Sequence, residues 1–166
     1  MNKALRTIDK VSKAGGLLAA ACIVLLVSLI LVETLLRLLL DRSLFIAEEF
    51  SAYLMANFVM LGLAYTLGEG GHIRVNLLLS RMKGTSLQIF ELAAFMAGCG
   101  IFVMLTWELW LLLFDNFITD QRSMNVTRVP IYLPQIGMVV GSALMTLQMA
   151  ASAVKIIISL IAPKYT

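Results

Sequence analysis

The residues able to do chemistry stand near the ends of long apolar runs. Glu33 and Arg37 are four positions apart, which puts them on one helix face with the acid before the base. We interpret them as an ion pair near the lipid headgroups or as a contact to another subunit. Glu48 and Glu49 are adjacent, so on a helix they point about 100° apart and form no carboxylate dyad. They are interpreted as acids that complement the start of a helix dipole, or as partner contacts.

The sequence contains no motif typical of catalysis or of cofactor binding. The chain has one histidine, and its two cysteines, Cys22 and Cys99, lie in apolar runs without a metal-ligand or redox spacing. The glycine-rich turn at 68–72 has neither the dinucleotide nor the P-loop spacing, and no strand is predicted before it. We therefore expect no enzyme, no cofactor, no metal site and no nucleic-acid partner.

Composition sets the fold class. Of 166 residues, 60% are hydrophobic and 14% are charged, whereas soluble domains have roughly 45–50% apolar and about 25% charged residues. A soluble core of this size cannot hide such an excess, so lipid must cover it. The chain is predicted to be a single all-α membrane domain, residues 1–166.

Four apolar stretches have the length of a membrane span. The first follows a basic start and is longer than the apolar part of a signal peptide, so we expect it to be retained. Two further segments mix basic and apolar residues and are predicted as interfacial amphipathic helices. The spans are expected at about 15–40, 50–67, 87–114 and 131–162, and the interfacial segments at about 3–13 and 72–83.

The distribution of Lys and Arg predicts the orientation. Nine of these residues fall on the side of the two termini and the connection between spans two and three, and four fall on the opposite side. Positive residues concentrate on the cytoplasmic side of membrane proteins. Both termini are therefore predicted to be cytoplasmic.

Small and amide side chains within the spans predict helix contacts. Asn57 lies near the middle of the second span, where an amide usually hydrogen-bonds across a helix interface. Ala94 and Gly98 are four apart in the third span, and Gly137 and Gly141 form a GxxxG in the fourth. Each pair is predicted to let another helix approach closely.

Three short motifs follow one another along the chain. Glu48 and Glu49 open a span, and a His-Ile-Arg-Val-Asn stretch at 72–76 follows it. Gln121-Arg122-Ser123 then precedes Val129-Pro130. With these motifs, nearly the whole chain resembles the small integral membrane subunit of tripartite ATP-independent periplasmic (TRAP) transporters, in its Q-type, four-helix form. In that family a pair of acids precedes the second helix, and a serine-containing loop precedes the proline that opens the last helix. Asn76 stands where the family more often has Asp, so an acidic role there is not carried over.

The resemblance implies a location in the bacterial cytoplasmic (inner) membrane and two protein partners besides membrane lipids. One is a large polytopic permease subunit of the elevator type, whose scaffold this chain would brace. The other is a periplasmic substrate-binding protein, which it would help to dock during sodium-coupled uptake of an organic acid. The substrate itself is specified by those partners.

This interpretation assigns candidate roles by position. Candidate partner-facing residues on the periplasmic side are Glu33, Arg37, Arg42, Glu48, Glu49, Asp120 and Arg122. Candidate residues of a cytoplasmic interfacial brace are His72, Arg74, Asn76 and Arg81.

Two other classes of protein are alternatives to the scaffold subunit. One is a small autonomous proton-coupled transporter that acts as a homodimer, with Glu33 as the proton carrier. The other is a membrane enzyme or quinone-redox subunit, which a single histidine and the lack of a cofactor motif disfavour. Secondary transporters usually have internal repeats and helices broken at mid-membrane, and neither is visible in this sequence.

Overall fold

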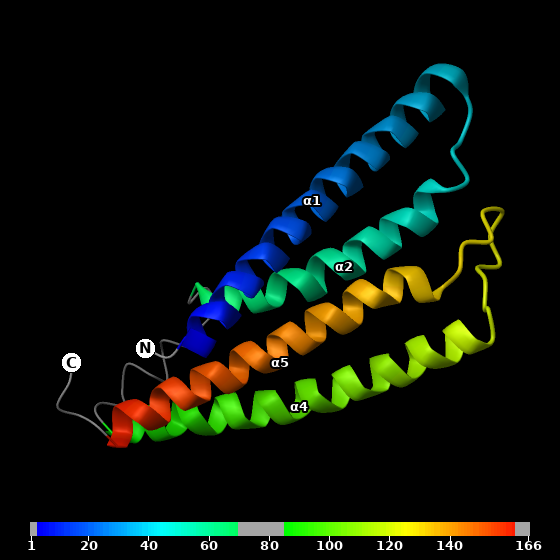
Figure 1. The fold of residues 1–166 in the computed structure, drawn as a ribbon. Helices are drawn as coiled ribbons and strands as arrows, with labels where there is room; N and C mark the ends of the chain where they lie inside the picture. The colour runs from blue at the N-terminus through cyan, green and yellow to red at the C-terminus, as the bar shows by residue number, and fades with distance from the viewer. Residues whose placement is uncertain (1–2, 70–84, 162–166) are drawn as a thin grey trace.

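The computed structural model describes residues 3–69 and 85–161, which form four long helices (Figure 1). In chain order these are α1 (Lys3–Leu40), α2 (Ala47–Gly68), α4 (Thr85–Ile118) and α5 (Tyr132–Ile161). All four are long and apolar enough to cross a membrane. The predicted all-α membrane architecture with four spans is confirmed.

The start of α1 differs from the sequence prediction. Residues 3–13 were expected to form a separate interfacial helix, but α1 runs unbroken from Lys3 to Leu40, a length of about 57 Å. Gly15 and Gly16 do not end a helix here. A Cβ on Gly15 would lie 3.3 Å from the Leu61 oxygen, and one on Gly16 would lie 2.6 Å from Tyr65 Cγ. The two glycines therefore let α2 pack closely against a continuous α1. The predicted segment 72–83 lies outside the described residues.

Local chemistry accounts for several helix ends. Asp41 follows α1, and Asp120 lies just beyond the end of α4; both have φ of 45°. Aspartate tolerates this left-handed conformation better than most residues. Pro134 lies in the first turn of α5, where a missing backbone N–H costs no helical hydrogen bond.

The helices form two hairpins that pack side by side. The α1–α2 hairpin and the α4–α5 hairpin meet through α2 and α5, so the helices are ordered α1, α2, α5, α4 (Figure 1). A smaller contact joins α1 to α5. Towards the connection at 41–46, α1 and α2 diverge (Figure 1). The arrangement leaves α1 and α4 on the two outer edges.

The buried core is small for a chain of this length. Ala64, Leu67 and Met145 form a buried apolar cluster, and side chains such as Phe95 and Phe102 of α4 pack against it. Large apolar side chains along all four helices are exposed. In a bilayer these surfaces face lipid tails or another subunit, neither of which penalises apolar exposure.

Candidate functional site

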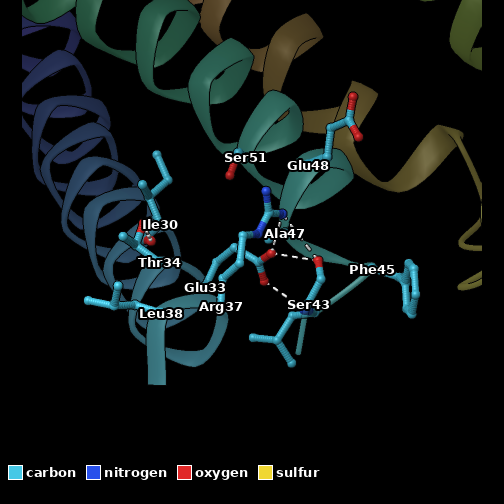
Figure 2. A pocket seen from close by; sticks show the side chains of 11 residues that line it. Ile30, Glu33, Thr34, Arg37, Leu38, Ser43, Phe45, Ala47, Glu48 and Ser51 are labelled. Atoms are coloured by element: carbon cyan, nitrogen blue, oxygen red, sulfur yellow. Dashed lines mark hydrogen bonds and ion pairs between the residues drawn. The ribbon is translucent and has the colours of Figure 1, made fainter. Parts of the chain in front are cut away.

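Glu33 and Arg37 form a polar cluster where α1 and α2 are connected. Arg37 Nη2 donates to Glu33 Oε1 at 2.7 Å, and Ser43 Oγ donates to the same oxygen at 2.6 Å. The backbone N–H of Leu44 donates to Glu33 Oε2 at 2.7 Å (Figure 2). Glu33 thus ties the 41–46 connection to the last turns of α1. Arg42 is exposed on that connection.

A cavity of about 770 Å³ opens beside this cluster, where α1 and α2 diverge. Its α1 wall mixes apolar side chains with Thr34 and the Glu33–Arg37 pair, and its α2 wall includes Glu48 and Ser51 (Figure 2). The lining has both charged and apolar parts. It therefore resembles the amphipathic surface of a membrane protein near the headgroups more than a catalytic centre.

The two adjacent acids that open α2 have different environments. Glu48 is exposed, whereas Glu49 is only 6% exposed. Tyr53 Oη donates to Glu49 Oε1 at 2.7 Å, and Thr127 Oγ1 donates to Glu49 Oε2 at 2.5 Å. Thr127 belongs to the loop between α4 and α5, so Glu49 bonds a residue 78 positions away. Glu49 is therefore buried and bonded to other residues of the chain, whereas Glu48 is exposed.

The 119–131 loop, which joins α4 to α5, carries the remaining candidates of this end. Asp120 Oδ2 and Arg122 Nη2 form an ion pair at 3.0 Å, and both side chains are exposed. Backbone hydrogen bonds fold the loop onto itself, from Ser123 N to the Val129 oxygen at 2.9 Å and from Ile131 N to the Gln121 oxygen at 3.0 Å. The loop is thus an ordered hairpin-like turn.

Buried polar groups at the opposite end were not predicted from the sequence. Gln148 of α5 is 1% exposed and Ser12 of α1 is 2% exposed. Ser12 Oγ donates to Gln148 Oε1 at 3.2 Å, and Gln148 Nε2 donates to Asp9 Oδ1 at 3.2 Å. Lys155 Nζ lies 3.6 Å from the same Asp9 oxygen. These groups form a polar network that joins α1 to α5.

One signal could have found this network. Gln148 is an amide within an apolar span, as Asn57 is, and the rule that singled out Asn57 applies to both. Asn116 and Gln135 are a second case, because both are buried and Asn116 Nδ2 donates to Gln135 Oε1 at 3.0 Å. In these cases, an amide side chain within a span lies at a contact between two helices.

The candidate packing residues of α2 and α5 meet one another. Asn57 Nδ2 donates to the Pro134 oxygen at 3.0 Å and to the Tyr53 oxygen at 2.8 Å. Gly137 faces Asn57, whose amide occupies the space that a Cβ would take. A Cβ on Gly141 would lie 2.5 Å from the Met60 carbonyl carbon and 2.8 Å from the Leu61 nitrogen. The α2 backbone therefore crosses α5 at Gly141.

Ala94 and Gly98, the other pair of small residues, lie in different environments. A Cβ on Gly98 would lie 2.9 Å from Met149 Sδ, so Gly98 lies against α5. Ala94 is exposed, so the pair does not form the shared packing face within this chain that its spacing suggested. The predicted brace residues His72, Arg74, Asn76 and Arg81 lie outside the described residues. Within the described ranges, no group of three or more His, Cys, Asp or Glu side chains could hold a metal.

These features define a four-span membrane protein whose charged groups lie mainly towards the two ends of its helices. Residues 26–158 match the family model of the DctQ component of tripartite ATP-independent periplasmic transporters. The chain belongs to this family, which confirms the resemblance noted in its sequence. No curated protein shows significant sequence similarity to it.

Membership in the family sets the general role of the chain. It is the small membrane subunit of a TRAP transporter, located in the inner membrane. The family consists of transporter components rather than enzymes, and it works with a large permease subunit and a periplasmic binding protein.

Proposed function

We propose that this chain braces the fixed scaffold of the large elevator-type permease subunit and helps to dock the periplasmic binding protein during sodium-coupled uptake of an organic acid. The observation that carries the proposal is the match of residues 26–158 to the family's small membrane component. The charged groups of the chain support it, because the ion pairs of the described residues lie towards the ends of the helices. An autonomous secondary transporter usually has its substrate site near mid-membrane.

The outer helices supply surface for bracing. Along α4, large apolar and aromatic side chains are exposed, among them Trp107, Trp110 and Phe114. Such side chains pack well against another helix without a polar contact, and small residues such as the exposed Ala94 allow close approach. We therefore assign α4 as the main contact with the large subunit.

The docking role is assigned to the end that carries the 41–46 connection and the 119–131 loop. Positive-residue counting predicts that this end is periplasmic. Arg42, Glu48, Asp120 and Arg122 are exposed there and are the residues proposed to face the binding protein. Glu33, Arg37 and Glu49 bond to other residues of the chain. We therefore propose that they hold the docking surface in shape rather than contact the partner.

Reconstitution tests the proposed function. The chain alone in liposomes is expected to give no uptake of organic acid, whereas liposomes that also contain the large subunit, with the binding protein and a sodium gradient, are expected to give uptake. Radiolabelled substrate accumulation measures both. Proton-driven uptake by the chain alone, abolished in Glu33→Gln, would instead support the autonomous transporter.

Charge reversal at the loop tests docking. Arg122→Glu is expected to lower uptake several-fold at limiting binding protein with little change in expression, because exposed ion pairs such as Asp120–Arg122 contribute little stability. Uptake divided by the amount of assembled complex is the measurement. Arg128→Glu makes the same charge change on the same loop and serves as the matched control. Equal losses in both variants would attribute the effect to net charge rather than to position 122.

A further inference from the structure

Glu49 makes the side-chain contact that joins the first hairpin to the outer loop of the second. It projects from the first turn of α2, is nearly buried, and accepts hydrogen bonds from Tyr53 at 2.7 Å and Thr127 at 2.5 Å. Distances of 2.5–2.7 Å are typical of hydroxyl groups that donate to an ionised carboxylate, and such bonds are stronger than neutral ones. Ser123 and Asn125 also lie near the carboxylate.

The loop held by Glu49 is internally ordered and is bonded to α4 at its start. Gln121 N donates to the Asn116 oxygen of α4 at 3.1 Å, and within the loop Arg128 N donates to the Asn125 oxygen at 3.1 Å. Those bonds shape the loop, but they do not fix its position relative to α2. The Thr127–Glu49 bond helps to fix that position, since it crosses from the loop to the other hairpin.

The tip of the loop exposes apolar side chains. Met124 is fully exposed and Val126 is 82% exposed. The tip lies in a polar loop beyond the ends of α4 and α5, where the flanking Asp120 and Arg122 are also exposed (Figure 1). Exposed apolar groups with a charged rim are characteristic of a protein contact rather than of a lipid-facing surface.

We infer that Glu49 is a positioning residue that holds the 119–131 loop in place, so that Met124 and Val126 form a preformed contact for the periplasmic binding protein. The inference rests on the proposed docking function and adds the residue that controls it. A surface ordered before binding loses less conformational entropy when the partner arrives. Loss of the Glu49 contact therefore weakens docking without altering the transport cycle of the large subunit.

The test uses the full transporter in liposomes, with uptake measured over a range of binding-protein concentrations. In Glu49→Ala and Thr127→Val, the half-saturating concentration of binding protein is expected to rise roughly three- to tenfold, with maximal uptake unchanged. Thr127→Ser keeps the hydroxyl donor and is expected to restore the wild-type value. Thr127→Val also keeps the test valid if Glu49→Ala fails to assemble.

A spin label at Met124→Cys, with Cys22 and Cys99 replaced by alanine, reports the loop directly. Its mobility is expected to rise in Glu49→Ala and Thr127→Val but not in Glu48→Ala, whose neighbouring carboxylate is exposed. Adding binding protein is expected to immobilise the label in the otherwise wild-type transporter. Immobilisation by the lipid bilayer alone would overturn the assignment of the tip to a protein partner.

Each contrary result has a distinct meaning. Unchanged mobility in both variants would overturn the positioning role of Glu49. Raised mobility with an unchanged half-saturating concentration would overturn the link between the loop and docking. If the wild-type transporter takes up substrate equally well without binding protein, the proposed docking function itself fails, whatever the Glu49 variants do.

Discussion

Gly141→Leu is expected to destabilise the bundle more than any other single substitution considered for this chain. A Cβ at this position would lie 2.5 Å from the Met60 carbonyl carbon and 2.6 Å from its oxygen, and these backbone atoms cannot move aside as a flexible side chain can. The larger side chain must therefore push α5 away from α2, which separates the two hairpins. Overpacking typically costs 1–3 kcal/mol, and we expect about 3 kcal/mol or more here.

Thermal unfolding in detergent and the yield of assembled complex measure this effect. Gly100→Leu is the matched control, because Gly100 is also inside a helix but a Cβ there meets nothing within 4 Å. Both substitutions improve intrinsic helix propensity by a similar amount. The difference between them therefore isolates the packing at position 141. Equal melting temperatures for the two variants would contradict the α2–α5 crossing described above.

Gln148→Leu is the second substitution with a large expected effect. It removes both the acceptor for Ser12 and a donor to Asp9, at a site where Gln148 and Ser12 are almost completely buried. A buried polar group left without its partner costs about 1–3 kcal/mol. We expect the N-terminal part of α1 to detach from α5, seen as faster proteolysis or hydrogen exchange before residue 15.

A double-mutant cycle with Ser12→Ala checks the cause. If the cost of Gln148→Leu arises partly from the stranded Ser12 hydroxyl, the double variant will be less destabilised than the sum of the single variants. Coupling energies between helices in membrane proteins average about 0.6 kcal/mol, so a value of that order is expected. Strict additivity would show that the two side chains act independently.

The larger features of this protein could be predicted from its sequence because they depend on local composition. Uninterrupted apolar runs specify the spans, since a backbone in lipid must satisfy its hydrogen bonds internally and only a helix does so within one segment. The Glu33–Arg37 pair was likewise available from a spacing of four residues, and the structure contains it at 2.7 Å. The family resemblance rested on short motifs that follow one another along the chain, and the match over residues 26–158 confirms it.

The unpredicted features depend on residues distant in the chain. The basic segment at 3–13 was predicted to be an interfacial helix separate from the first span, because it mixes charged and apolar residues whereas the run from Gly15 has no charge. In the fold α2 packs against Gly15 and Gly16, so the helix continues through them. The Ser12–Gln148 contact joins positions 136 apart, and no local pattern specifies which helix of a bundle meets which.

The adjacent acids of α2 show most clearly the difference between what local sequence determines and what tertiary packing determines. The sequence alone determined that Glu48 and Glu49 begin a helix and lie about 100° apart around it. It could not decide which of the two is buried, because that depends on where the 119–131 loop returns after α4. The tertiary structure places Thr127 against Glu49 and leaves Glu48 exposed, since the α2–α5 packing brings that loop over one face of α2 only.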